Sequence, residues 1–421
     1  DYSNILDYAV NMTKFFNVKN INFFLFLIFP VSILAGNFAI NLNILIISLI
    51  FIYYIITKKI KNIYKDKTFL LLNFFLISLS INLIFSNNIS LSYPRVVKIF
   101  FIIYFIFAFK QLLADFNKNQ IEKIYKVWSI IFTFIILDLI IEYFRGENII
   151  GFKSIMPGIR LASFTGTESV IGNYFYGFAL ICLSYFQNNF SQKKCLNIGL
   201  VFFFIIISFI IGERANFIKT FIIIIFFTLF VYDFKFKSKI FLLLLIICFM
   251  GAFLNLNTKY KTRYFDQISL IFESGGVSKY LKNSQYGAHY NVANEIFKEN
   301  PFFGVGIKNF RIESMKDKYN NLDHPKNALR AATHPHQIHY EFLSETGAFG
   351  YFSFLIFIFL SLYWSIKNSL ISKNIYQISS ILFILASLLP LLPSGSFLST
   401  YTSSIFWLNY SIMVGYNGIK S

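Results

Sequence analysis

Long apolar segments recur along the chain, separated by short polar ones. About twelve have the length and composition of a membrane-spanning helix. Because lipid offers backbone amides no hydrogen-bond partner, each segment is predicted to be helical. The pattern therefore predicts an all-α, polytopic membrane helix bundle without a cleavable signal peptide, since the first apolar run leads straight into further spans. The expected spans are roughly residues 20–35, 41–57, 68–86, 96–113, 126–144, 167–186, 196–212, 216–232, 240–256, 347–366, 376–393 and 396–416.

The longest polar segment lies between the ninth and tenth expected spans, at about residues 257–346. It contains charged residues, turns and amphipathic helical stretches, which are typical of a water-exposed region. We therefore predict three parts. Residues 1–256 carry nine membrane helices, residues 257–346 form a large helical loop, and residues 347–421 carry the last three membrane helices.

The charges of the short loops alternate along the chain. Lysines cluster after the second, fourth, sixth, eighth and tenth expected spans, whereas the intervening loops lack such clusters. Short cytoplasmic loops of membrane proteins carry the excess of Lys and Arg. We therefore expect both termini on the cytoplasmic side and the large loop on the opposite, outer side.

Composition excludes a soluble fold. Hydrophobic residues make up 56% of the chain and charged residues only 14%, against about 25% charged in average soluble proteins. The net charge of +18 resembles that of a nucleic-acid-binding protein, but most of it lies in alternate loops, where it sets topology, and we expect no nucleic-acid partner. The cysteines Cys182, Cys195 and Cys248 show no CxxC spacing, which argues against a disulfide framework and a thiolate metal site.

Arginine and histidine are confined to the outer side of the expected topology. Lysine satisfies the charge rule as well as arginine does, so this segregation needs a second cause. Arginine binds phosphate through two parallel hydrogen bonds, so we hypothesise an outward-facing site for a phosphorylated ligand; the alternative is chance in a small set. The residues are Arg95, Arg145, Arg160, Arg214, Arg263, Arg311 and Arg330, with His289, His324, His334, His336 and His339.

Two arginines stand beside membrane helices. Arg214 lies between two expected spans with almost no loop, where a charge is costly and usually pairs or serves a site. The alternatives for Arg214 are a salt bridge to Glu213 or a side chain that reaches the lipid headgroups. Arg160 shortly precedes the sixth span, and its alternative is an ordinary loop charge. Asp138 and Glu142, one turn apart near the outer end of the fifth span, could hold an arginine, mark a polar cavity, or simply lie at the interface.

Three histidines fall within the segment THPHQIHYE, residues 333–341. Pro335 suits the first position of a helix, with one of the two residues before it as the cap. In that helix His336, His339 and Tyr340 would share one face. A histidine just above the bilayer could act as a general base, because the pKa of imidazole lies near working pH. The alternatives are a zinc site, which no thiolate or HExxH pattern supports, and a structural helix cap.

Four sequence elements together resemble the O-antigen ligase and O-antigen polymerase superfamily. The run HQIHYEFLSETGAFG at residues 336–350 looks like its histidine signature, and NPFFGVGIKNF at residues 300–310 is similar to its Pro-x-x-Gly-x-Gly element. The GERA turn at residues 212–215 resembles its small-residue–Arg turn. Arg160, followed by Gly-Asn at residues 172–173, is similar to its earlier arginine segment. The expected span number and the position of the large loop agree with this resemblance.

The resemblance implies a GT-C-like helical fold and a metal-independent, inverting glycosyltransferase without a cofactor, in the bacterial inner membrane with its active site facing the periplasm. The donor would be a glycan on undecaprenyl pyrophosphate, the acceptor lipid A–core or a related glycan, and membrane lipids would surround the protein. His336 would take the proton from the acceptor hydroxyl. The implied pyrophosphate-binding residues are Arg160 and Arg214, helped by Arg263, Arg311 and His289, with His334, His339 and Tyr340 in support.

The chain departs from the family pattern at two positions. The family often has a histidine or an arginine-like residue just before the catalytic histidine, whereas here that residue is Pro335, with His334 one step further back. Where many members carry an arginine that opens the helix before Pro-x-x-Gly-x-Gly, this chain has His289. If His289 replaces that arginine, pyrophosphate binding would depend on pH.

Other functions remain open at this point. A polymerase of the same fold would differ from a ligase in its acceptor and not in its donor chemistry. A transporter or flippase predicts charges deep within several spans and often repeat symmetry, whereas the charges here lie mostly near span ends. A membrane-anchored binding module would not need about twelve spans. We therefore expect a ligase first and a polymerase second.

Overall fold

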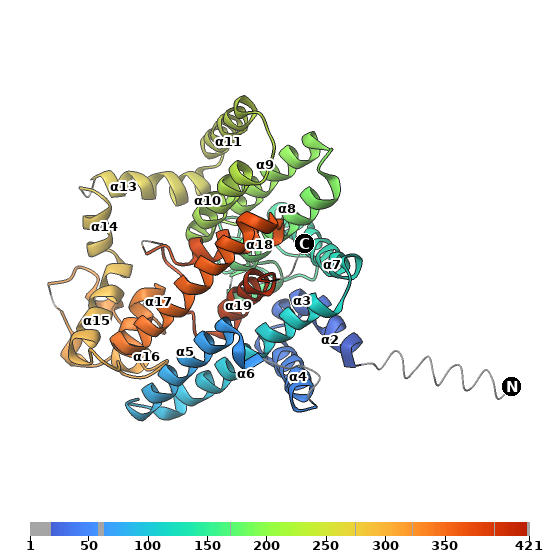
Figure 1. The fold of residues 1–421 in the computed structure, drawn as a ribbon. Helices are drawn as coiled ribbons and strands as arrows, with labels where there is room; N and C mark the ends of the chain where they lie inside the picture. The colour runs from blue at the N-terminus through green and yellow to red at the C-terminus, as the bar shows by residue number, and fades with distance from the viewer. Residues whose placement is uncertain are drawn as a thin grey trace.

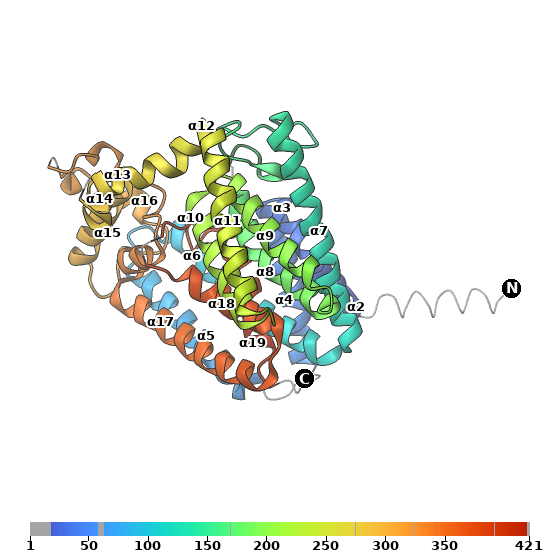
Figure 2. The same ribbon diagram turned by 90° about the horizontal axis from the view of Figure 1, so that it is seen from above.

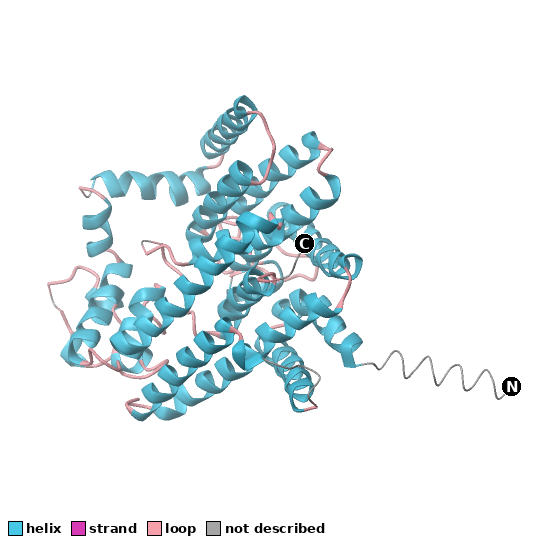
Figure 3. Cartoon of the chain, viewed as in Figure 1, coloured by secondary structure: helices cyan, strands magenta, loops and turns pink. Residues whose placement is uncertain are grey.

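The computed structural model describes residues 18–57, 63–168, 170–273, 275–321, 323–390 and 392–418. The regular elements in these ranges are all helices, joined by loops and turns, and none of the ranges contains a strand (Figure 3). The predicted all-α class is therefore confirmed.

The helices before the large loop follow the apolar segments of the sequence (Figure 1). The first expected span is divided into two short helices, the second of which has Pro30 in its first turn, where proline is tolerated. The elements are α2 (Val18–Leu27), α3 (Phe29–Leu34), α4 (Asn37–Ile56), η1 (Ile63–Lys65), α5 (Lys67–Ile84), α6 (Ile89–Asp115), α7 (Lys118–Arg145), η2 (Ser163–Glu168), α8 (Ile171–Phe190), α9 (Lys194–Ile210), α10 (Arg214–Phe230) and α11 (Phe236–Leu256).

The large loop is itself mostly helical, and the helices α17, α18 and α19 follow it. Its helices α13 to α16 lie together at one side of the bundle (Figure 2). The elements are α12 (Thr258–Tyr260), η3 (Lys261–Asp266), α13 (Gln267–Glu273), α14 (Val277–Asn283), α15 (Gln285–Glu299), α16 (Phe310–Glu313), η4 (Asp317–Tyr319), η5 (Asn327–Leu329), α17 (Ile338–Ser372), α18 (Ile375–Ser387) and α19 (Thr400–Gly415).

Six of the described helices are long and apolar enough to cross a membrane, namely α4, α5, α6, α7, α11 and α17, and three apolar helices are shorter. The chain is therefore a helical membrane protein, while the twelve crossings and the GT-C-like topology stay predictions. Only 11% of the apolar stretch of α11 is buried within the protein. This helix lies at the edge of the bundle (Figure 1). Such an apolar, unpacked helix suits a lipid-facing position.

The bundle packs around α19, whose side chains are almost all buried. Since lipid is as apolar as these side chains, packing and interhelical hydrogen bonds hold membrane helices together. The Ser361 and Tyr410 hydroxyls join α17 to α19 across 2.7 Å, and the Ser78 and Ser353 hydroxyls join α5 to α17 across 2.6 Å.

The eleventh and twelfth expected spans are shorter as helices than the apolar pattern indicated. Helix α18 ends at Ser387 and α19 begins at Thr400, whereas the expected spans were 376–393 and 396–416. Pro390 and Pro393 lie in the gap, where proline cannot continue the helical hydrogen-bond pattern. The segment that connects the two helices matters because it lines the cavity described below as the candidate active site.

The NPFFGVG and ETG motifs lie side by side and hydrogen-bond to each other. The amides of Val305 and Gly306 donate to the carbonyls of Ser344 (3.1 Å) and Glu345 (2.9 Å). Helix α17 is broken at Gly347, whose φ of +63° favours glycine. A Cβ there would lie 2.4 Å from the carbonyl of Phe302. The two motifs can approach this closely only because a glycine stands at position 347.

Candidate active site

A cavity of about 320 Å³ lies where α8, α10 and α19 begin and α18 ends. Arg160, Lys219, His334 and His336 line it together with Glu213. These residues come from three separate parts of the sequence, two of them at the positions expected for pyrophosphate binding and for the base. The cavity therefore brings an imidazole, a guanidinium and an ammonium group to one place.

The loop that carries Arg160 is held by the two carboxylates of α7. Glu142 accepts hydrogen bonds from the backbone amides of Ala162 (2.9 Å) and Ser163 (2.6 Å). Asp138 accepts from the Ile149 amide (2.8 Å) and the Ser163 hydroxyl (2.5 Å). Both carboxylates are buried. They hold the loop backbone, not an arginine side chain, so the expectation of interfacial exposure is wrong.

The Arg160 loop also hydrogen-bonds to the turn before Arg214. The Leu161 amide donates to the Ile211 carbonyl (3.0 Å). Gly212 has a φ of +79°, and a Cβ there would lie 2.1 Å from the Ile159 carbonyl oxygen. Only glycine allows so close an approach, which explains the small residue in the GERA turn.

Glu213 joins the same turn to α8 and to Arg160. Its carboxylate accepts from the Gly172 amide (2.7 Å) and lies 3.6 Å from the Arg160 guanidinium. The ion pair that the sequence left open for Arg214 is therefore made by Arg160. Arg214 itself has no ion pair with any described residue.

Arg263 brings a third guanidinium to this turn. Its Nε donates to the Gly212 carbonyl at 2.5 Å. Burial, and next the charges of Arg214 and Arg160, lower the pKa of Arg263, so Arg263 lies within electrostatic reach of both other arginines. Such a cluster of like charges is costly alone and favours a bound anion. The predicted grouping of Arg160, Arg214 and Arg263 is thus present, although only Arg160 lines the cavity.

His336 lies before α17 and not within it. The helix begins at Ile338, because the Gln337 side chain accepts from the amides of His339 (2.7 Å) and Tyr340 (3.0 Å) and so caps it. The expected helix starting at Pro335, with His336 sharing a face with His339, is therefore wrong. His336 adopts a φ of +58°, which is uncommon for a residue with a side chain, and its carbonyl accepts from the Ser394 amide (2.8 Å).

The imidazole of His336 lies among other rings. Its ring centroid is 4.1 Å from that of His334, 5.3 Å from that of His289 and 5.9 Å from that of Tyr286. Burial, and then the neighbouring His334 and His289, lower the pKa of His336 to about 3. The expectation of a pKa near working pH is corrected accordingly, and at neutral pH this imidazole is a neutral proton acceptor.

The other expected site residues lie around the cavity and not in its lining. His339 is fully engaged, since its ring nitrogens bond to the Leu388 carbonyl and the Tyr351 hydroxyl, each at 2.9 Å. His289 is buried, and its Nδ1 lies 3.1 Å from the Arg330 carbonyl. Arg311 lies within electrostatic reach of His334, whose pKa is lowered to about 4 by burial first and by Lys308 next. Tyr340 stacks on a tyrosine of α15.

Two buried lysines at or near the cavity were not singled out from the sequence. Lys219 lines the cavity, is only 5% exposed, and donates to the Pro393 carbonyl at 3.3 Å. It lies within an expected span, and an ionisable residue at such a position is a functional candidate by default. Lys308 is equally buried; its ammonium lies 3.7 Å from Glu341 and bonds to Ser396. Glu341 also accepts from the Phe397 amide (2.8 Å), and this network ties the 394–397 segment to α17.

The comparison with known families agrees with this geometry. Residues 199–355 match the family model described as O-antigen ligase. This segment of the chain is therefore similar to the O-antigen ligase family. No curated protein matches the chain. The family implies an O-antigen ligase or polymerase type of activity, with a lipid-linked glycan and an acceptor as substrates in general.

Some of the candidate site residues lie within the matched segment 199–355, and others lie outside it. The matched segment includes Arg214, Arg263, Arg311 and His336. Arg160 lies outside the matched segment, as does the 394–397 segment that hydrogen-bonds to the His336 backbone. Within the described ranges no group of three His, Cys, Asp or Glu side chains is arranged to hold a metal ion.

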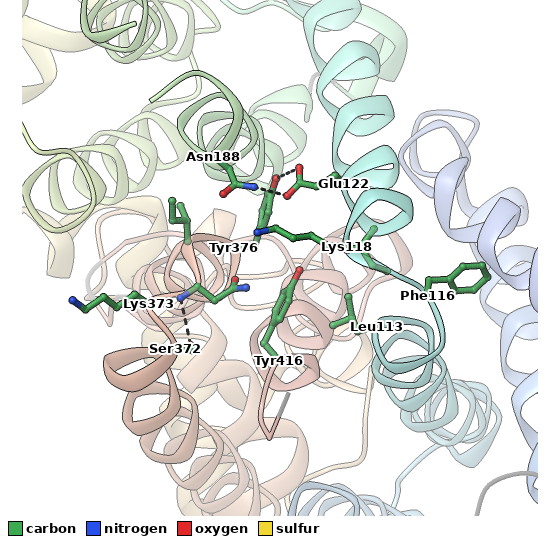
Figure 4. Close-up of a pocket in the computed structure, with 12 residues that line it drawn as sticks. Leu113, Phe116, Lys118, Glu122, Asn188, Ser372, Lys373, Tyr376 and Tyr416 are labelled. Atoms are coloured by element: carbon green, nitrogen blue, oxygen red, sulfur yellow. Dashed lines mark hydrogen bonds between the residues drawn. The ribbon is translucent and has the colours of Figure 1, made fainter. Parts of the chain in front are cut away.

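A second cavity, of about 420 Å³, lies at the other ends of α8, α18 and α19 (Figure 4). Lys118, Glu122, Asn188, Tyr376 and Tyr416 are among its lining residues. The Glu122 carboxylate points toward Tyr376 and Asn188, which donate hydrogen bonds to it at 2.9 and 2.6 Å. Its lining contains no histidine or arginine, and all of its lining residues lie outside residues 199–355, so we do not assign the reaction to it.

Proposed function

We propose that the protein is an O-antigen ligase-type glycosyltransferase. It moves a glycan from undecaprenyl pyrophosphate to lipid A–core or a related acceptor, at the periplasmic face of the bacterial inner membrane. The observation that carries the proposal is the meeting of His336 with Arg160 and Lys219 in one cavity. The Arg160 Nε is buried and has no hydrogen-bond partner among the described residues, which leaves a donor for an anionic ligand.

The arginines would stabilise the leaving group. As the bond between the anomeric carbon and the pyrophosphate oxygen breaks, its electron pair remains on the pyrophosphate. Donors that are already in place where charge develops lower the barrier without a metal ion. Arg160 and Lys219 are available from the cavity, and Arg214 and Arg263 lie behind Arg160 at the Gly212 turn. Attack from the opposite face would invert the anomeric carbon.

His336 would accept the proton of the acceptor hydroxyl as the new glycosidic bond forms. In the empty site its low pKa makes it a weak base. An adjacent negative charge raises the pKa of an imidazole, so a bound pyrophosphate would strengthen this base. Base strength and donor binding are then linked, which would limit proton abstraction to the loaded enzyme.

His289, His334, Arg311, His339 and Tyr340 take different supporting parts in this proposal. His289 and His334 surround His336 and keep it neutral, and Arg311 adds positive charge on the far side of His334. His339 and Tyr340 position the start of α17 through the contacts described above.

A complementation experiment tests the function and separates ligase from polymerase. The gene is expressed in strains that lack either enzyme, and cell-surface glycan is resolved by length and by attachment to lipid A–core. We expect restored attachment of long chains in the strain without ligase. If only the strain without polymerase regains its chain length, the protein is a polymerase and not a ligase. If neither strain is restored, both assignments are contradicted.

A further inference from the structure

A groove of about 610 Å³ lies on the outer part of the chain, beside the His336 cavity and distinct from it. One wall is a face of α15, since Gly287, Tyr290, Asn291 and Asn294 follow at helical spacing. Tyr340 of α17 lies across from them. The remaining lining residues are Val277, Ser278, Lys282 and Pro390. The volume lies within the range of small-ligand sites, roughly 300–1,000 Å³.

The polar groups of this groove are available to a ligand. The Tyr290 hydroxyl is buried and without a hydrogen-bond partner among the described residues. The side-chain amides of Asn291 and Asn294 also make no hydrogen bond within that part of the chain. A buried polar group without a partner is uncommon and calls for an explanation. A ligand with hydroxyl groups would supply the missing bond of Tyr290 and could also bond to the two accessible amides.

A row of aromatic rings connects the groove to the catalytic cavity. Tyr286 lines the cavity and contacts the ring of His336 edge-on, with 5.9 Å between centroids. One turn along α15, Tyr290 stacks near Tyr286, with centroids 6.5 Å apart. Tyr290 in turn stacks on Tyr340, with centroids 4.6 Å apart and planes within 5°. The row therefore runs from the cavity into the groove without a break.

This combination fits a saccharide chain. Sugar hydroxyls both donate and accept hydrogen bonds, and an amide side chain can do both as well. The C–H faces of sugar rings are apolar and suit the faces of amphipathic tyrosines. The lining contains no carboxylate and one lysine, so acidic sugars would also be accepted.

We propose that this groove binds the sugars of the glycan chain that lie beyond the reacting residue. Its key residues are Tyr290, Asn291 and Asn294, and the aromatic row guides the chain from the His336 cavity. The site deepens the proposed function and rests on it for its role in transfer. The chain could belong to the donor or to the acceptor, because both present the same chemistry.

Binding of free oligosaccharide tests the groove directly. Purified protein in lipid nanodiscs is titrated with glycan released by mild acid from the lipid-linked donor, and separately with delipidated acceptor oligosaccharide. We expect the Asn291→Ala/Asn294→Ala double variant to bind one of them about tenfold more weakly, the effect of losing two ordinary hydrogen bonds. The glycan whose affinity falls identifies the source of the chain. Unchanged affinity for both, or no binding of either by the wild-type protein, overturns the proposal.

Glu295→Ala is the matched control, because Glu295 lies on α15 outside the groove lining and pairs with Lys298 at 2.7 Å. It should leave oligosaccharide affinity unchanged. An equal loss in the control would mean that α15 is disturbed as a whole and would contradict the assignment to the two asparagines.

Transfer assays with donors of increasing glycan length give a second readout. The double variant should lose transfer of long glycans while transfer of the shortest donor stays near the wild-type rate. An equal loss at every length contradicts a remote saccharide site. If oligosaccharide binds to the groove but the wild-type protein transfers nothing, the glycosyltransferase proposal fails while the groove stands.

Discussion

The two cavities at opposite ends of α8, α18 and α19 differ in how their polar groups are satisfied. At one end Glu122 accepts hydrogen bonds from Tyr376, Asn188 and Asn189. At the other, the Arg160 Nε and the His334 Nε2 are buried without a partner among the described residues. The satisfied cavity is the larger of the two, at about 420 Å³ against 320 Å³. Unused donors and acceptors, more than volume, therefore mark the site of chemistry.

The largest expected effect is that of His336→Ala. Loss of a general base removes about 10²–10⁴-fold in rate, so transfer from the lipid-linked donor should become undetectable. The measurement is transfer by purified protein in nanodiscs, with thermal unfolding to show that the variant is folded. His324→Ala is the control, since His324 is a partly exposed loop residue outside the cavity lining that bonds to the Lys282 carbonyl. Surviving activity in the His336 variant would rule out the assigned base.

Arg160→Lys should lower transfer by roughly 10–100-fold, the kinetic equivalent of a hydrogen bond to a charged group. The lysine keeps the charge but loses the planar fork that binds phosphate through two bonds. The comparison is Arg145→Lys, because Arg145 is exposed and pairs with Glu147 at 3.4 Å. Equal rates for the two variants would place the pyrophosphate away from Arg160.

Lys219→Met removes the buried ammonium group from the cavity at similar side-chain volume. We expect about a tenfold loss of transfer, from one charge-assisted hydrogen bond to the leaving group. Because the group acts on the donor, the KM for the acceptor should stay unchanged. Lys118→Met, at the rim of the opposite cavity, should have no effect on transfer. An effect of similar size there would break the contrast between the two cavities.

The pH dependence follows from the lowered pKa values of His336, about 3, and His334, about 4. Both imidazoles stay neutral in the folded, empty protein down to these values, whereas the unfolded chain takes up protons below about pH 6.5. The free energy of unfolding should therefore be constant above pH 6.5 and fall as the pH drops from 6.5 toward 4. The double variant His334→Gln/His336→Gln should flatten this decline in chemical denaturation curves measured from pH 8 to pH 4. An unaltered decline would mean that other groups cause it.

The smallest effect is expected for Glu122→Gln in the satisfied cavity. The neutral amide still accepts but pairs less well with three donors, which should lower the free energy of unfolding by about 1 kcal/mol. Transfer should match that of the wild-type protein. A loss of transfer without a loss of stability would show that this cavity also takes part in the reaction.

The helices were predictable because lipid imposes one solution on the backbone. Long apolar runs in this sequence became helices at nearly the expected positions, and Pro390 and Pro393 account for the main error. The Gly212 turn brings Arg160 and Arg263 together beside Arg214, while their role in binding pyrophosphate stays a prediction. The tight turn at Gly212 could also be predicted, because almost no loop separates the two apolar segments on either side of it.

The position of His336 could not be read from the sequence. A proline followed by a periodic segment is typical of a helix start, but the Gln337 side chain caps the helix two residues later. Only then do the rings of His334 and His289 surround His336 and lower its pKa. That shift depends on burial and on neighbours 47 and 2 residues away in the chain, which no local pattern encodes.

The sequence by itself determined the membrane environment, the helical class and the residue types available for phosphate chemistry, because hydropathy and charge act locally along the chain. Tertiary structure alone decided which of those residues meet. It placed Arg160, Lys219 and His336 around one cavity and turned His339 away from it. It also aligned Tyr286, Tyr290 and Tyr340 into a row. These relations arise from close packing between distant segments, where a single glycine or a buried carboxylate sets the distance between two functional groups.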